Sequence, residues 1–221
     1  MVNLPLRGVI FDMDGVLTDS EPFIIEAATR MFAERHHVSV RHDDFLPFTG
    51  AGEDRFIGGV ANLHGVKLTM PDDKLRTYEI YLEIIRGRLH PLAGAVEFIE
   101  MCHRRGLKCA LATSADRVKM EGNLREIGIP AERFAAIVTG NEIERKKPDP
   151  QAFVVAAAKL GLSNAECVVV EDAVNGVIAG KAAGSRVLGI TTSFIAEKLK
   201  AVGADWTAAD LAHVPGEVLG G

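Results

Sequence analysis

Hydrophobic and polar positions follow two different patterns along this chain, one typical of β-strands and one typical of α-helices. Residues 7–12 form a short apolar stretch that ends on an acid, as a buried β-strand does. From residue 23 to residue 34, apolar side chains recur every fourth position and charged ones take the other face, which predicts an amphipathic helix. Helical spacing continues from about residue 40 to residue 90 without a convincing strand. We therefore predict an all-helical insert over residues 18–88.

Beyond this insert, apolar runs of strand length alternate with helical stretches. The strand candidates are Leu107–Ala112, Ala136–Thr139, Cys167–Glu171 and Arg186–Ile190. The helices are expected near residues 93–104, 116–127, 150–160 and 174–183. Such alternation predicts an α/β fold with a Rossmann-like parallel sheet that is covered on both faces. We expect the strand at residues 7–12 to join this sheet, so that residues 1–17 and 89–221 form the core domain and residues 18–88 form a helical cap domain.

The composition of the chain argues against some classes of function. The chain has 221 residues, 48% of them hydrophobic, and a net charge of −5. A mildly negative chain is not expected to bind nucleic acid or a membrane surface, because both are polyanionic. The sequence shows no signal peptide, no membrane-spanning run and no cysteine pair with metal-ligand spacing. We therefore expect a cytoplasmic protein, and a monomer by default. The net charge does not argue against a small phosphorylated metabolite as a substrate, because a few local cations are enough to hold one.

Polar side chains with complementary chemistry follow the predicted strands at their carboxyl ends, where open α/β sheets bind ligands. They are Asp12 and Asp14, then Thr113 and Ser114, then Glu171 and Asp172. The hydroxyls of Thr113 and Ser114, with the N–H groups of the following helix start, are suited to phosphate oxygens. Lys147 stands directly before Pro148, and proline makes its loop stiff. A stiff loop can hold a lysine in the position where it neutralises the negative charge of a ligand.

These residue types predict phosphoryl transfer. Asp12 and Asp14 are two carboxylates separated by one residue. Asp12 can attack an electrophile, while Asp14 donates or accepts a proton. Attack on a phosphate dianion requires a hard cation and a lysine to neutralise the charge. We hypothesise that Mg²⁺ bridges Asp12 and Asp172, with Lys147 as the second cation.

Each of these features has a simpler explanation when it is taken alone. The Asp12–Asp14 pair is then a turn or helix cap, Thr113 and Ser114 form an N-cap, and Lys147 is a solvated surface lysine. These residues occur in order along the chain, each at a predicted strand end or in an adjoining loop. This placement favours one shared site.

Four segments together resemble the motifs of the haloacid dehalogenase-like hydrolases. Residues 11–20 (FDMDGVLTDS) are similar to motif one, residues 111–114 (LATS) to motif two, residues 147–150 (KPDP) to motif three, and residues 170–177 (VEDAVNGV) to motif four. The helical insert after motif one resembles the cap of the subfamily that includes β-phosphoglucomutase and phosphoglycolate phosphatase. This resemblance covers nearly the whole chain.

The resemblance implies a role for each matching residue. Asp12 would form an aspartyl-phosphate, and Asp14 would protonate the leaving group, activate water and lend a backbone carbonyl to Mg²⁺. Asp172 would complete the metal site, and Glu171 would either bind the ion directly or hold its ligands in place. Thr113, Ser114 and Lys147 would hold the transferring phosphoryl group. The presence of Asp14 favours phosphoryl transfer over dehalogenation.

Two residues of the cap help to distinguish a phosphatase from a sugar phosphomutase. Ile24 stands where β-phosphoglucomutase carries a histidine, and Glu53 stands near the position of a cation that grips the second phosphate of the sugar. Both departures favour a Mg²⁺-dependent phosphatase over a sugar phosphomutase. A non-catalytic binding domain on the same fold is a third alternative, which the intact acidic set opposes. The entry of the insert directly after Asp12 predicts a cap that closes, with hinges near residues 16–20 and 86–91.

Overall fold

A six-stranded parallel sheet forms the centre of the computed structural model, which describes residues 4–48 and 52–219 apart from the side chain of Glu53. The strands are β1 (Gly8–Phe11), β2 (Lys108–Ala112), β3 (Ala136–Val138), β4 (Cys167–Glu171), β5 (Arg186–Ile190) and β6 (Trp206–Ala208). Their order is β3-β2-β1-β4-β5-β6, and every neighbouring pair is parallel. The predicted α/β fold is therefore confirmed, and the strand after which the cap enters lies in the middle of the sheet.

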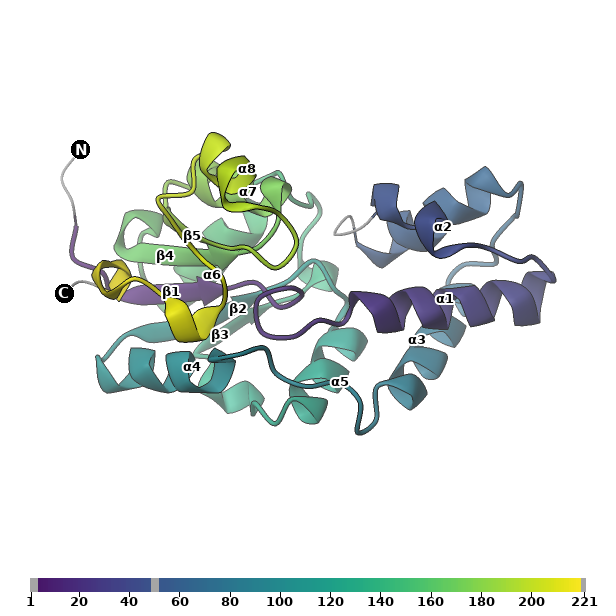
Figure 1. The fold of residues 1–221 in the computed structure, drawn as a ribbon, viewed down its shortest axis with the longest axis horizontal. Helices are drawn as coiled ribbons and strands as arrows, with labels where there is room; N and C mark the ends of the chain where they lie inside the picture. The colour runs from purple at the N-terminus through teal and green to yellow at the C-terminus, as the bar shows by residue number, and fades with distance from the viewer. Residues whose placement is uncertain (1–3, 49–51, 220–221) are drawn as a thin grey trace.

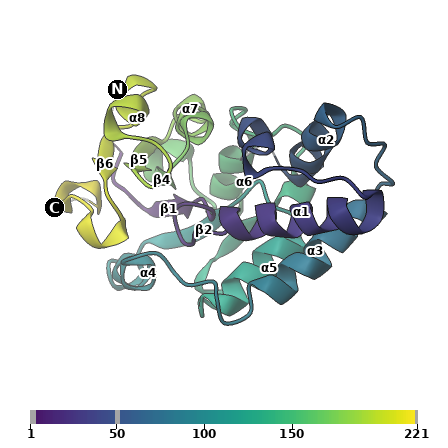
Figure 2. The ribbon, with the colours of Figure 1, turned by 45° about the vertical axis from the view of Figure 1, so that its right-hand side comes forward.

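Helices cover both faces of this sheet, as Figures 1 and 2 show. The core helices are α4 (Ala95–Arg104), α5 (Arg117–Glu126), α6 (Gln151–Leu160), α7 (Val174–Ala182) and α8 (Ala196–Ala201). Strand β1 shows why two layers form, because Val9 and Phe11 belong to the apolar cluster with α4 and α5, whereas Ile10 belongs to the cluster with α6 and α7. Alternate side chains of one strand thus supply both layers.

The insert is helical in its described residues. Helices α1 (Glu21–His36), α2 (Glu53–Leu63) and α3 (Asp72–Ile84) lie beyond the carboxyl edge of the sheet, with short 3₁₀ turns between α1 and α2 (Figure 1). Helix α3 begins at Asp72, directly after Pro71. The exact domain boundaries, at residues 17/18 and 88/89, stay predictions.

The two chain segments that connect the insert to the core lie side by side. The Thr18 hydroxyl donates to the carbonyl of His90 at 2.9 Å, and the Leu92 N–H donates to the carbonyl of Leu17 at 2.9 Å. The predicted hinge segments therefore form one hydrogen-bonded connection next to Asp14, whose backbone bridges to Thr18.

A second contact joins the insert to the core through helices α3 and α5, which lie side by side in Figure 2. The buried Tyr81 hydroxyl donates to Asn123 Oδ1 at 2.5 Å. Lys74 Nζ, near the start of α3, lies 3.0 Å from a carboxylate oxygen of Asp116 at the start of α5, and 2.8 Å from Asp54 of α2. The insert in this structure is thus held over the core at two separate places.

Strand β6 and helix α8 were not predicted from the sequence. Strand β6 has three residues at the edge of the sheet, and its first two positions are only partly buried. Short edge strands lack the continuous apolar run that marked the central strands, so the hydrophobic pattern does not reveal them.

Two helical glycines offer a matched test of helix–sheet packing. A Cβ at Gly180 of α7 would lie 2.9 Å from Val187 and 3.2 Å from Val169, whereas a Cβ at Gly58 of α2 meets nothing within 4 Å. We expect Gly180→Ala to lower the free energy of unfolding by about 1–3 kcal/mol through overpacking. Gly58→Ala should raise it by about 0.5–1 kcal/mol through helix propensity. Urea denaturation measures both, and equal effects of the two changes would contradict this packing.

Candidate active site

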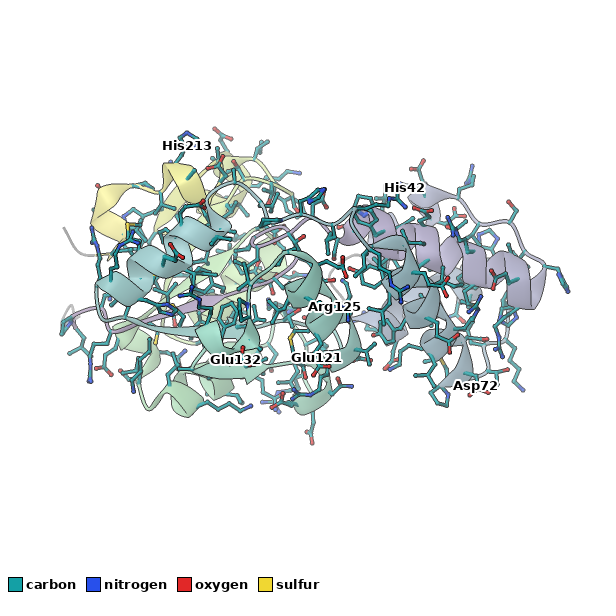
Figure 3. The ribbon with its side chains drawn as sticks, turned by 90° about the horizontal axis from the view of Figure 1, so that it is seen from below. His42, Asp72, Glu121, Arg125, Glu132 and His213 are labelled. Carbon is teal, nitrogen blue, oxygen red and sulfur yellow. The ribbon has the colours of Figure 1, made fainter. Side chains whose placement is uncertain are left out.

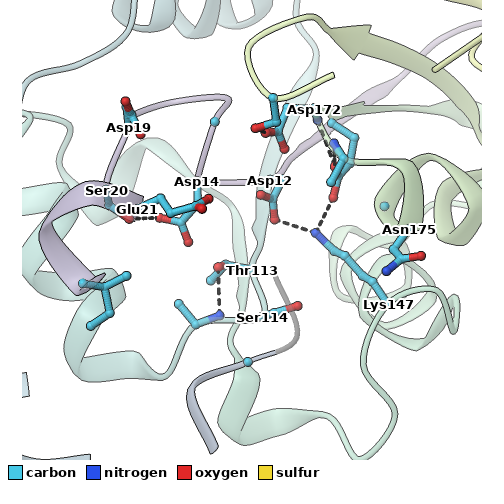
Figure 4. A pocket seen from close by; sticks show the side chains of 18 of the residues that line it. Asp12, Asp14, Asp19, Ser20, Glu21, Thr113, Ser114, Lys147, Asp172 and Asn175 are labelled. Carbon is cyan, nitrogen blue, oxygen red and sulfur yellow. Dashed lines mark hydrogen bonds and ion pairs between the residues drawn. The ribbon is translucent and has the colours of Figure 1, made fainter. Parts of the chain in front are cut away.

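The predicted acids and hydroxyls meet at the carboxyl edge of the sheet. Asp12 directly follows β1, Thr113 directly follows β2, and Glu171 is the last residue of β4. Because these three strands are neighbours in the sheet, their ends place the side chains around one point, as Figure 4 shows. The structure therefore brings together residues that lie as many as 159 positions apart in the chain, as Asp12 and Glu171 do.

Lys147 lies at the centre of this group and is 9% exposed. Its ammonium nitrogen lies 2.5 Å from Asp12 Oδ1 and 2.6 Å from Glu171 Oε1 (Figure 4). The Phe153 ring lies beneath the ammonium, with 4.8 Å between Nζ and the ring centroid. The reading of Lys147 as a solvated surface lysine is thus wrong, since it is buried between two carboxylates.

Glu171 is fixed by contacts on both of its oxygens. While Oε1 accepts from Lys147, Oε2 accepts from the backbone N–H groups of Asp172 and Ala173, each at 2.9 Å. A Cβ at Gly176 would lie 1.8 Å from Glu171 Oε1. Gly176, Gly180 and Gly184 recur every fourth residue, which in the sequence alone predicts close helix–sheet packing, but the structure shows that the missing side chain of Gly176 makes room for the Glu171 carboxylate.

Asp172 completes an acidic cluster. Each of Asp12, Glu171 and Asp172 offers a carboxylate oxygen, and these oxygens all lie within 4.8 Å of one another. The Ser193 hydroxyl donates to Asp172 Oδ2. On the opposite side, Gly15 has a φ of +77°, and a Cβ there would lie 1.9 Å from the same oxygen. Only glycine therefore allows the turn after β1 to approach Asp172 so closely.

Burial of this cluster raises carboxyl pKa values. Burial raises the pKa of Asp12 to about 7, against the lowering effect of Lys147, and the charges of Glu171 and Asp14 add to the rise. Burial, with the charges of Glu171 and Asp12, also raises the pKa of Asp172 well above its ordinary value. Burial alone would lower the pKa of Lys147, but Asp12 and Glu171 outweigh it and raise that pKa.

The charge balance of the cluster fits a divalent cation. The three carboxylates Asp12, Glu171 and Asp172 face one ammonium, from Lys147, so two negative charges remain in a buried space. The donors are all carboxylate oxygens, which are the ligands that Mg²⁺ prefers. Since both oxygens of Glu171 are engaged by Lys147 and backbone N–H groups, Asp12 and Asp172 are the side chains best placed to hold the ion.

Asp14 lies apart from this cluster, at the wall of the cavity. Its side chain is 31% exposed, and Lys119 Nζ lies 3.0 Å from its Oδ2. The Ser20 hydroxyl donates to its Oδ1, as drawn in Figure 4. Ser20 does occupy the position before α1, but its side chain makes no N-cap hydrogen bond. A serine directly before a helix predicts an N-cap, but that prediction is wrong for Ser20, because the Asp14 carboxylate takes its hydroxyl.

Thr113 and Ser114 face the same cavity. The Thr113 hydroxyl accepts from the backbone N–H of Ala115 at 3.0 Å. The Ser114 hydroxyl oxygen is buried and, among the residues that the structure describes, has no hydrogen-bond partner. Such an orphaned buried group is expected to bind a ligand oxygen. Neither residue caps α5, since Asp116 occupies the position before that helix.

A cavity of about 470 Å³ opens between these residues and the cap. Asp12, Asp14, Ser114 and Lys147 line its floor, and the apolar side chains of Ile24, Leu46 and Phe56 line its cap side. Ile24, singled out from the sequence, is thus a wall residue. Glu53 begins helix α2, but its side chain lies outside the described part of the structure.

The sequence pattern did not reveal two of the contacting residues. Lys119 resembled any charged residue of an amphipathic helix, because its partner Asp14 is 105 positions away. Ser193 lies shortly beyond the end of β5, so the rule that strand ends carry functional residues could have indicated it.

The parallel sheet with acids and a buried lysine at its carboxyl edge, beneath a helical insert, defines a capped, Rossmann-like α/β domain with a polar site at the strand ends. The family model for haloacid dehalogenase-like hydrolases matches residues 6–184, and the chain belongs to this family. Its relatives include named phosphatases, so the predictions of the family and of a phosphohydrolase enzyme are confirmed.

Three similar proteins illustrate the range of the family. The chain is 42% identical over 212 residues to the chloroplastic protein SUPPRESSOR OF QUENCHING 1 of Arabidopsis thaliana; the match covers 95% of this chain but only 20% of that relative. It is 30% identical to the phosphorylated carbohydrates phosphatase of Thermotoga maritima, covering 85% of this chain and 87% of the relative. The crystal structure of a putative β-phosphoglucomutase from Thermotoga maritima matches with a TM-score of 0.74 and 29% identity, covering 92% of this chain and 94% of that one.

None of the helices in the described residues combines the length and apolar character needed to cross a bilayer. The cytoplasmic location and the monomeric state stay predictions, and one relative is named as chloroplastic.

The raised pKa of Asp12 predicts a pH-dependent stability without metal. Because the folded-state pKa of about 7 exceeds the ordinary value of 3.8, the folded chain holds a proton that the unfolded chain releases. Stability should therefore fall as the pH rises from about 4 to about 7 in EDTA, each raised pKa unit corresponding to about 1.4 kcal/mol. Asp12→Asn should flatten this slope in urea denaturation, and Mg²⁺ should flatten it in the wild type.

The exposed Asp43 provides the control for this measurement, since its side chain is 82% exposed. Asp43→Asn should leave the slope unchanged. An unaltered slope in Asp12→Asn would show that Asp12 does not carry the raised pKa.

Proposed function

We propose that this protein is a Mg²⁺-dependent phosphatase that hydrolyses a small phosphorylated carbohydrate through an aspartyl-phosphate at Asp12. The observation that carries the proposal is the buried ion pair between the Asp12 carboxylate and Lys147, beside Glu171 and Asp172, at the floor of the cavity beneath the cap. The orphaned Ser114 hydroxyl beside it adds a binding group for a phosphate oxygen.

Asp12 is the nucleophile in this proposal. Its carboxylate attacks the phosphorus atom, a bond forms between Asp12 and phosphorus, and the bond from phosphorus to the sugar oxygen breaks. Lys147, already 2.5 Å from Asp12, offsets the negative charge of the incoming phosphate, while Thr113 and Ser114 bind its oxygens. Water then attacks the phosphorus atom and releases inorganic phosphate, which restores the Asp12 carboxylate.

Asp14 is the proton-transfer group of both steps. It lines the cavity with a partly exposed carboxylate and lies away from the acidic cluster, so it can face a leaving group without competing for the cation. It gives a proton to the sugar oxygen as that oxygen leaves, and it later takes a proton from the attacking water.

Asp12 and Asp172 would hold Mg²⁺, with Glu171 fixed beside them and with the backbone carbonyl of Asp14 as a further ligand by resemblance to the family. When bound, the ion supplies positive charge that reduces the repulsion between the phosphate and the carboxylates. The two uncompensated negative charges of the cluster support this assignment.

The cavity favours a phosphatase over a phosphomutase. Among its described lining residues, the lysines and arginines are Lys119 and Lys147, and both are paired with carboxylates. A mutase must bind two phosphates at once, and the cap side instead presents Ile24, Leu46 and Phe56.

The phosphatase name of the Thermotoga maritima relative supports a phosphorylated carbohydrate as substrate. The intact acidic cluster, with its buried lysine, opposes a non-catalytic binding domain.

Steady-state kinetics with Mg²⁺ test the proposal directly. We expect release of phosphate from p-nitrophenyl phosphate and from members of a sugar phosphate panel. Asp12→Asn should lower kcat by roughly three orders of magnitude or more, because it removes the nucleophile and keeps the shape of the side chain. Asp43→Asn, at an exposed site, should retain full activity.

An inert wild-type protein on the whole panel would overturn the phosphatase proposal. Conversion of β-glucose 1-phosphate to glucose 6-phosphate without release of phosphate would establish the mutase in its place.

A further inference from the structure

We propose that Lys119 is a positioning residue for Asp14, and that it determines which carboxylate oxygen of Asp14 carries the proton given to the leaving group. The inference rests on the proposed function, since it assigns a role within the same proton transfer.

The contact itself is short and shielded from solvent. Lys119 Nζ lies 3.0 Å from Asp14 Oδ2, and the lysine side chain is 6% exposed. Lys119 points inward from α5, whereas Glu121 and Arg125 of the same helix are exposed on its outer side, which Figure 3 shows from below. A lysine on the inner face of a helix is rare, because burial of an ammonium is unfavourable unless a carboxylate compensates it.

The surroundings of Lys119 fix it in this orientation. The ring of Tyr81, from cap helix α3, lies 6.0 Å from its ammonium. The Tyr81 hydroxyl donates to Asn123 Oδ1 at 2.5 Å, one helical turn beyond Lys119 on α5. The amide nitrogen of Asn123 donates to the sulfur of Met13 at 3.2 Å, and Met13 directly precedes Asp14. The same network thus holds Lys119 and the backbone that carries its partner.

The two oxygens of Asp14 have different neighbours, and this difference determines where a proton can reside. Lys119 faces Oδ2, and an ammonium has donors but no acceptor, so a hydrogen on Oδ2 would point at these donors and break the contact. Ser20 faces Oδ1, and a hydroxyl can donate or accept. Oδ1 is therefore the oxygen that can carry the proton while both contacts are kept.

Proton transfer follows from this arrangement. In the first step the proton on Asp14 Oδ1 moves to the sugar oxygen as its bond to phosphorus breaks, and Asp14 is left as a carboxylate that Lys119 stabilises. In the second step Oδ1 takes a proton from the attacking water, and the initial state returns. Lys119 remains charged and unreacted throughout, so it acts through Asp14 alone.

Two esters that differ in their need for a proton test this role. Glucose 6-phosphate has an alkoxide leaving group that must be protonated, whereas the nitrophenolate of p-nitrophenyl phosphate leaves unaided. The ratio of the two kcat/KM values reports the first step only, so it isolates acid catalysis from the later hydrolysis. We expect Lys119→Met to lower kcat/KM for glucose 6-phosphate about tenfold more than for p-nitrophenyl phosphate, a part of the 10²–10⁴ that a general acid contributes.

Three further variants make the test specific. Lys119→Arg, which keeps the charge, should restore most of the ratio. In an Asp14→Asn background, Lys119→Met should leave the ratio unchanged, because the group through which it acts is gone. Lys181→Met removes a lysine that lies 2.8 Å from Asp205, away from the cavity, and should behave as wild type.

Equal losses on both esters in Lys119→Met, or a full further loss in the Asp14→Asn background, would overturn the inference and leave the phosphatase proposal intact. Such results would show a packing role or direct contact with the substrate. A wild-type protein inert towards p-nitrophenyl phosphate and the whole sugar phosphate panel would overturn the phosphatase proposal and this inference with it.

Discussion

The burial of Lys147 between Asp12 and Glu171 is the interaction on which the site depends. Three carboxylates at one edge of a sheet repel one another, and burial makes their charged forms less favourable still, as the raised pKa of Asp12 shows. The ammonium at 2.5 Å and 2.6 Å offsets part of this repulsion and leaves a charge that a divalent cation can balance. Glycines at positions 15 and 176 are then required, since a side chain at either would collide with these carboxylates.

The cap is coupled to this centre through its attachments. One is the paired connection at Thr18 and His90, which begins just beyond Asp14. The other is the contact between helices α3 and α5, where Tyr81 lies against both Asn123 and the ammonium of Lys119. The attachment of the cap to the core and the placement of the Asp14 carboxylate therefore involve the same groups. In this arrangement a displaced cap would alter the surroundings of Asp14, the proposed proton donor.

Much of this site could be predicted from the sequence, for a physical reason. Asp12 and Glu171 lie at the ends of strands that are buried along their whole length, and such strands have a continuous apolar pattern. Parallel strands bring their carboxyl ends to one edge, so the chain positions of these acids were enough to group them. Lys147 was predicted because its loop adjoins the same edge, although its burial was not evident from charge.

The remaining contacts depend on geometry that a linear pattern does not contain. The inward direction of Lys119 depends on the rotation of α5 about its axis and on the packing of α3 against it. The Ser20 hydroxyl had two possible partners, the N–H donors of a helix N-terminus and the acceptor oxygens of a carboxylate, and the nearby charge of Asp14 decided between them. The edge strand β6 lacks the apolar run of the central strands, since it is short and only partly buried.

Chemical trapping of the covalent intermediate tests the central claim most directly. The wild-type protein would be mixed with Mg²⁺ and a ³²P-labelled sugar phosphate, quenched in acid within the first turnover, and mapped by mass spectrometry after proteolysis. The account predicts a phosphoryl group on the peptide that contains Asp12, located on the Asp12 side chain and absent from Asp12→Asn. A label on Ser114, or an active enzyme that carries no label at any time during turnover, would contradict it.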